Sequence, residues 1–144
     1  LRFTPDLAAF GAEQLRNNYF RPYLAPNGWA ADAAEAAPEL EIVWNEPQSI
    51  SQVRLFFDTD ADHAMENVQM GHYDSVMPCC IRDYVLSDDA GHELACVEGN
   101  HQTANTLTFP EPVTAQALRL RFRRPEGDVC PALMGIVIES KTTK

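Results

Sequence analysis

The chain has 144 residues, of which 45% are hydrophobic and 22% charged, a composition typical of one globular domain that buries its own core. Its net charge of −10 argues against nucleic acid or an anionic membrane as a general partner. No apolar run approaches the ~20 residues that a transmembrane helix needs. The chain begins without Met and without a signal segment, so we expect a piece of a longer protein and assign no cellular location.

The first 37 residues differ from the rest. The segment "PDLAAFGAEQLRNN" predicts one amphipathic helix from about Asp6 to Arg16, with Leu7, Phe10 and Leu15 on one side. The proline-containing stretch that follows predicts a loop. We therefore divide the chain into a lead-in over residues 1–37 and a domain over residues 38–144.

From Glu39 onward the hydrophobic period changes to two, which is typical of strands buried on one side. The apolar faces are those of Leu40, Ile42 and Trp44, of Val53, Leu55 and Phe57, and of Leu118, Leu120 and Phe122. The pattern predicts seven strands, over residues 39–44, 50–58, 80–88, 92–98, 105–109, 117–124 and 133–139. Short antiparallel strands joined by Gly, Pro and Asn turns predict an all-β fold, an antiparallel β-sandwich of the jelly-roll type.

The opposite face of the strand near residue 120 is basic. Arg119, Arg121 and Arg123 alternate with its apolar residues, and Arg54 is expected beside them. This row has two interpretations: a docking surface for an acidic partner, or a solvated face neutralised by Glu39 and Glu41. We favour the second.

One hairpin has a predicted register. A three-residue loop over residues 89–91, with Gly91 in the left-handed conformation, places Asp88 opposite His92. The same register pairs Leu86 with Leu94 and Tyr84 with Cys96. It predicts that Cys96 is a core thiol.

If the strands alternate in direction, the long connections and the unusual residues gather at one end of the sandwich. Loops on a rigid scaffold often carry binding residues. The residues expected at this end are Trp29, Asp58, Asp60, Asp62, His63, His72, Tyr73, Asn100, His101 and Cys130.

The sequence leaves the question of a metal site at this end unresolved between alternatives. Asp58, Asp60 and Asp62 are spaced as in a calcium loop, but His63 and Gln69 stand where an EF-hand has Gly and Glu. Calcium held by the three aspartates is one interpretation, and a solvated acidic loop is the other. A zinc site would use the set His63, His72, Cys79 and Cys80, whose adjacent cysteines fit one tetrahedral ion poorly. A Cys79–Cys130 disulfide is a further alternative.

Catalytic fingerprints are missing from the sequence. The glycines form neither G-x-G-x-x-G nor a phosphate loop, and no G-x-S-x-G elbow occurs. We predict that this part of the protein is not an enzyme.

The stretch "PELEIVWNEPQSISQVRLFFDTD" resembles the opening of a discoidin-type (coagulation factor 5/8 C-type) galactose-binding-like sandwich. Two further segments, "FDTDADHAMENVQMGHYDSVMPCCIRDYVL" and "VEGNHQTANTLTFPEPVTAQALRLRF", resemble the C-terminal domain appended to a class of bacterial FAD-dependent oxidoreductases. "NNYFRPYLAPNGWAAD" resembles the segment that leads into that domain. The resemblance implies a non-catalytic sandwich that follows a flavin-binding region. FAD would belong to that region, and this part would hold no cofactor; calcium at the three aspartates stays the open alternative given above.

Two functions from different classes follow. In the first, the domain binds a glycan or small carbohydrate, through aromatic stacking and planar polar groups at the loop end. The candidate contacts are Trp29, Asp60, His72, Tyr73, Arg82, Asn100 and His101. In the second, it is a structural domain docked on the flavin-binding region, and Trp29 and the methionines of residues 65–77 plug the sandwich. We favour the first slightly.

Overall fold

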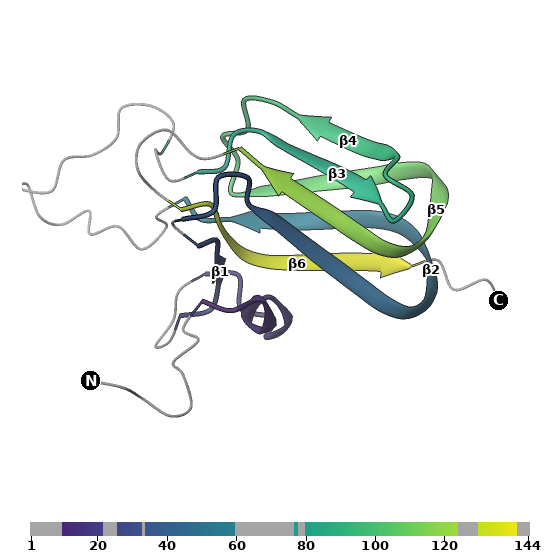
Figure 1. The fold of residues 1–144 in the computed structure, drawn as a ribbon, viewed down its shortest axis with the longest axis horizontal. Helices are drawn as coiled ribbons and strands as arrows, with labels where there is room; N and C mark the ends of the chain where they lie inside the picture. Colours follow the sequence, from purple (N-terminus) through teal and green to yellow (C-terminus); the bar gives the residue numbers. More distant parts are fainter. Residues whose placement is uncertain are drawn as a thin grey trace, which may run out of the picture.

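The computed structural model describes residues 10–21, 26–32, 34–59, 77, 80–123 and 130–140. This part of the chain forms one short 3-10 helix and a set of antiparallel strands (Figure 1). The elements are η1 (Ala12–Arg16), β1 (Trp29–Ala30), β2 (Glu39–Phe57), β3 (Tyr84–Asp88), β4 (Glu93–Val97), β5 (Ala104–Phe122) and β6 (Ala132–Ser140). None of the helical residues described is in a segment long and apolar enough to cross a membrane.

Two long strands, β2 and β5, contribute to both layers of the sandwich. The first half of β2 pairs with the end of β5, from Glu39 opposite Arg121 to Val43 opposite Ala117. The second half of β2 pairs with the start of β5 on one side and with β6 on the other. Strands β3 and β4 extend the first layer, and β1 extends the second beyond β6.

The predicted breaks after residue 44 and after residue 109 therefore lie inside continuous strands, so the expectation of separate strands on either side is wrong. Register shifts lie between Val43 and Gln48 and between Ile50 and Gln52. Such irregularities bend a strand without ending it, because pairing resumes beyond the extra residues. The bends carry each strand from one layer to the other (Figure 1).

The core lies between the two layers, as the period of two predicts. Val53, Leu55 and Phe57 face it from β2, and Leu118, Leu120 and Phe122 face it from β5; all six are buried. Aromatic pairs cross between the layers: the rings of Phe57 and Tyr84 lie 5.5 Å apart. The predicted antiparallel β-sandwich is confirmed.

The lead-in departs from its prediction. Helix η1 is a 3-10 helix of five residues, preceded by Gly11 in an extended conformation, and residues 1–9 lie outside the described part. Leu15 is buried in the core, but Phe10 is 56% exposed, so the two do not share a buried face. Phe20 stacks on Phe56 at 4.1 Å, which attaches the lead-in to the outside of the second layer. The boundary at residue 38 stays a prediction.

The structure of the β3–β4 hairpin confirms the predicted turn and contradicts the predicted register. Gly91 has a φ of +83°, and the backbone N–H of Asp88 donates to the carbonyl of His92 at 3.0 Å. A shift between Leu86 and Ser87 then places Leu86 opposite Ala95. Because a one-residue slip turns a side chain to the opposite face, Cys96 is exposed and the predicted core thiol is wrong.

The arginines of β5 form a neutralised outer face, as we expected. Arg54, which was expected beside them, lies instead on the second half of β2, over the ring of Phe56. Arg119 Nε lies 2.9 Å from Glu41, and Arg121 Nε lies 2.6 Å from Glu39. Both partners come from the neighbouring strand β2, directly opposite in the register. These cations are thus already engaged, which argues against a docking role.

Candidate ligand-binding end of the sandwich

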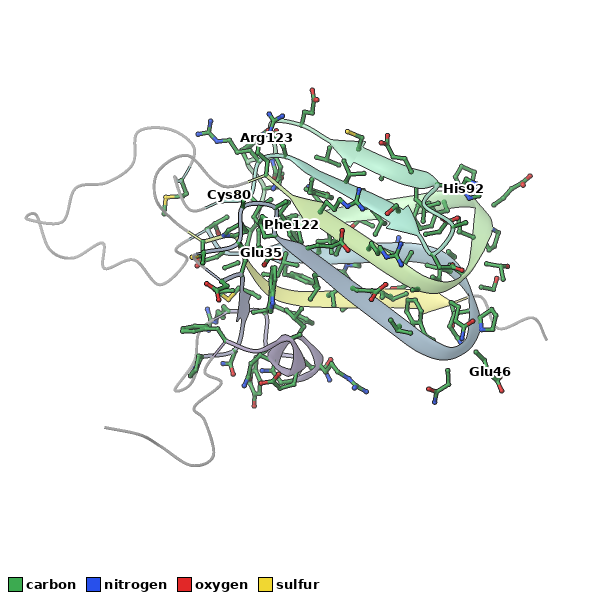
Figure 2. The ribbon with its side chains drawn as sticks, in the orientation of Figure 1. Glu35, Glu46, Cys80, His92, Phe122 and Arg123 are labelled. Atoms are coloured by element: carbon green, nitrogen blue, oxygen red, sulfur yellow. The ribbon has the colours of Figure 1, made fainter. Side chains whose placement is uncertain are left out.

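The ends of several strands meet at one end of the sandwich. The backbone N–H of Phe57 donates to the carbonyl of Thr103 at 2.8 Å, and that of Asn100 donates to Arg82 at 2.8 Å. The backbone N–H of Arg123 likewise donates to the carbonyl of Asp83 at 3.0 Å. We call this the loop end. Figure 2 shows Cys80, Phe122 and Arg123 at this end, and His92 and Glu46 at the opposite one.

A buried amide supports the loop end from beneath. Asn100 is 5% exposed, and its Nδ2 donates to the carbonyl of Ile81 at 2.8 Å and approaches Cys80 Sγ at 3.7 Å. Its Oδ1 accepts from the backbone N–H of Gln102 at 3.0 Å and from Asn105 Nδ2 at 3.1 Å. This amide is engaged within the fold, which does not favour a ligand contact, and the contact of Asn100 with a ligand stays a prediction. The role of this amide is to position the segment 99–103.

The network continues into the core. Asn105 Nδ2 also donates to the hydroxyl of Tyr84 at 3.0 Å. Burial raises the pKa of Tyr84, and the hydrogen bond from Asn105 offsets only part of that increase. Tyr84 is therefore a neutral acceptor at the base of the network. A connected buried network of this kind stiffens what rests on it.

Cys80 lies next to this network as a neutral thiol. Burial raises the pKa of Cys80; Arg82 works to lower it and Asp58 to raise it further. The thiolate is the form that binds metals and acts as a nucleophile, so this environment suits neither role. Arg82 lies two residues along the chain from Cys80 and is joined to Asn100 through its carbonyl, and Asp58 directly follows Phe57, which is joined to Thr103.

Polar side chains cover the network on the solvent side. His101 and Gln102 are exposed, and the Nε2 atoms of their side chains lie 2.9 Å apart. His101 Nδ1 lies 3.4 Å from the carbonyl of Gly99, so a proton on Nδ1 satisfies both contacts and fixes the ring. The hydroxyls of Thr59 and Thr103 are 3.2 Å apart.

The residues that the loop end brings together are polar, and each is exposed or half-buried. We call them the loop-end polar set: Asp58, Thr59, Arg82, His101, Gln102 and Thr103. Thr59, Gln102 and Thr103 were not among the predicted contacts. The available signal was their position, directly after a strand or beside His101 in the predicted loop.

The turn before His101 is held by Asp83. Its Oδ1 accepts from the backbone N–H of Gly99 at 3.0 Å, while its Oδ2 pairs with Arg123 at 3.0 Å. Gly99 has a φ of +66°, a conformation that other residues adopt rarely. The turn therefore depends on both a glycine and a carboxylate.

Trp29 belongs to the core. It is 9% exposed, and its ring lies 5.6 Å from that of Phe122. Of the two interpretations of this ring, plugging the sandwich fits its burial and stacking on a sugar does not. The ligand contact of Trp29 stays a prediction that its burial does not favour.

The other predicted contacts and the metal hypotheses fall largely on residues that are not described. Asp60, Asp62, His72 and Tyr73 lie outside the described residues, as do His63, Cys79 and most of the methionine-rich segment. Among the residues that are described, no three His, Cys, Asp or Glu side chains cluster as a metal site. Cys130 carries a free thiol. The calcium and zinc hypotheses stay predictions.

Solved structures with a similar fold are carbohydrate-binding modules. The family 32 carbohydrate-binding module of Streptococcus pneumoniae EndoD matches with a TM-score of 0.66 and 19% identity, over 96% of this chain and 91% of that one. The lectin domain of Lectinolysin complexed with Lewis B antigen matches with 0.63 and 12%, over 94% and 87%. The family 32 module of C. perfringens NanJ in complex with galactose matches with 0.59 and 12%, over 91% and 85%.

These likenesses decide the architecture. The chain has the galactose-binding-like β-sandwich fold. No family model and no curated protein sequence matches it. The neighbours are named as binding modules and a lectin domain.

Proposed function

We propose that the chain is a carbohydrate-binding accessory domain that holds a neutral glycan at its loop end. The observation that carries this proposal is the loop-end polar set resting on the buried Asn100 network. A sugar is recognised by side chains that donate and accept hydrogen bonds at fixed positions. A preformed site binds more tightly than a mobile one, because less conformational entropy is lost on binding.

The polar set offers the donors and acceptors that sugar hydroxyls need. Arg82 supplies planar donors, Asp58 supplies acceptors, and Gln102 supplies both. His101 adds an exposed ring whose orientation is fixed by its two contacts. The solved neighbours with the same fold support a carbohydrate as the ligand class, since their names state galactose and Lewis b as ligands.

A glycan array tests this proposal. The unmodified chain is screened beside His101→Ala/Gln102→Ala, with Glu46→Ala at the opposite end as the matched control. We expect binding that the double variant weakens by at least tenfold and that Glu46→Ala leaves unchanged. The screen is run with and without calcium, because the calcium hypothesis for the segment after Phe57 is a separate prediction. Binding unaffected by the double variant would contradict the proposed site.

A docking role is the second candidate, and the lead-in favours it. Phe10 and Tyr19 are 56% and 55% exposed, and Arg54 lies 5.4 Å over the ring of Phe56, which Phe20 covers. Exposed aromatic side chains of this kind are common in interfaces. The resemblance to FAD-dependent oxidoreductases supplies the partner in this hypothesis: a preceding flavin-binding region.

The docking hypothesis is tested in the longer protein. If Phe10 and Tyr19 contact the preceding region, Phe10→Ser/Tyr19→Ser should lower the thermal stability of the longer protein, because that contact is lost. Glycan binding should stay intact. Unchanged stability would contradict docking through the lead-in.

A further inference from the structure

A second concave surface opens on the side of the sandwich, away from the loop end. It has a volume of about 590 Å³ and lies between the first half of β2, the last residues of β6 and helix η1. In Figure 1, the coiled ribbon of η1 lies next to β6, with which it is in contact. We call this surface the side groove.

In the described part of the chain, no strand covers either layer at this groove. There, Glu39–Val43 pair with β5 on one side only. Among the same described residues, 136–140 of β6 pair only with β2, since β1 reaches no further than Ala132 and Leu133. The inner-face side chains Leu40, Ile42, Ile136 and Ile138 therefore line the groove.

One aromatic residue and a polar rim complete the lining. Trp44 is half-buried on the same face of β2 as Leu40 and Ile42, and its carbonyl accepts from Gln116 Nε2 at 3.3 Å. The polar lining residues come from three separate segments: Glu13, Arg16 and Asn18; Glu41 and Gln48; and Ser140.

From this lining we propose that the side groove is a second carbohydrate site, independent of the loop end. A sugar ring has an apolar C–H face and an edge of hydroxyls, and an indole beside amide, carboxylate and guanidinium groups complements both. The volume falls within the range of small-molecule sites, about 300–1,000 Å³.

The charges of the rim favour a neutral ligand. Glu13 and Arg16 come from the same short helix and carry opposite charges, and Glu41 is paired with Arg119 at 2.9 Å. The molecule as a whole carries a net charge of −10, which disfavours acidic glycans. An apolar peptide would use the lining but leave the polar rim without partners.

Trp44 itself provides the measurement. The chain has two tryptophans, so Trp29→Phe leaves Trp44 as the single tryptophan, whose emission is selected by exciting the indole alone. This variant is titrated with cellotriose, N-acetylchitotriose and Lewis b tetrasaccharide. We expect a saturable change in Trp44 emission with at least one of them. If Trp29→Phe does not fold, the indole N–H resonance of Trp44 in the unmodified chain gives the same information.

Two further variants separate this site from the loop end. His101→Ala/Gln102→Ala should leave the Trp44 response unchanged, whereas Arg16→Ala/Gln48→Ala should weaken it by roughly tenfold. If the unmodified chain shows a Trp44 response but no binding that depends on His101 and Gln102, the proposed function is contradicted and this inference stands. No saturable response to any of the three sugars, or a response abolished by the loop-end variant, would overturn the second site.

Discussion

The two ends of the sandwich use polar side chains in opposite ways. At the end formed by the bends of β2 and β5, polar groups close the turns on themselves: Asp88 accepts from the backbone and the ring of His92, and Gln116 donates to the carbonyls of Trp44 and Asn45. At the loop end, the side chain of the buried Asn100 positions residues 101–103, which are exposed. The polar groups of the bend end therefore stabilise turns, whereas those of the loop end face solvent on a rigid support.

The largest expected effect comes from removing the amide beneath the loop end. Asn100→Leu should lower the free energy of unfolding by about 2–3 kcal/mol, because Asn105 and two backbone groups lose their buried partner. Urea unfolding measures this. Gln102→Ala is the matched control on the exposed side and should change stability by about 0.5 kcal/mol or less. A loss no larger than that of the control would show that Asn100 does not support the loop end.

A smaller effect is expected at the opposite end. Partial burial works to raise the pKa of Asp88, but hydrogen bonds from the ring and the backbone of His92 outweigh it, so the pKa lies below its ordinary value of 3.8. Because the folded pKa is depressed, this carboxylate stabilises the fold above the ordinary pKa. That contribution is lost as the pH falls through the folded pKa.

Asp88→Asn should therefore lower the free energy of unfolding by about 1 kcal/mol at neutral pH. The difference from the unmodified chain should shrink as the pH falls below about 4. Urea unfolding at about pH 7 and about pH 3 makes the comparison. An unchanged difference at the two pH values would mean that the charge of Asp88 does not fasten this turn.

The smallest effect is expected between the two ends, on the outer face of the first layer. Arg121 pairs with Glu39 across exposed strands. Exposed pairs contribute little, so Arg121→Ala should change stability by about 0.5 kcal/mol or less and leave glycan binding unchanged. A clear loss of glycan binding in this variant would extend the site from the loop end onto this face.

The sequence predicts the buried faces of the strands well and their continuity poorly. The period of two identifies Val53, Leu55 and Phe57 because burial on one face selects every second residue. Pro47, Pro110 and Pro112 indicate turns, yet they lie where the β2–β5 pairing is interrupted inside continuous strands. Proline removes one hydrogen bond between paired strands, but it does not fix the direction of the chain beyond it. A bend within one strand and a turn between two strands therefore look the same in the sequence.

The candidate site is harder to predict than the fold. The segment "GNHQT" places polar residues at the loop end, but sequence does not distinguish the buried amide of Asn100 from the exposed one of Gln102. Trp29 has a similar ambiguity, since a loop tryptophan suits both a core and a sugar site. Cys96 was misplaced because a single register shift is decided by backbone geometry rather than by residue type.

Chemical-shift mapping by NMR is the most direct test of glycan binding at the loop end. The ¹⁵N-labelled chain is titrated with galactose and with the glycan that gives the strongest array signal. We expect saturable shifts in the backbone amides of residues 58–59, 82 and 99–103, with the hairpin residues 89–92 unchanged. Shifts confined to residues outside the loop end, or no shifts with any glycan that the array detects, would contradict binding at the loop end.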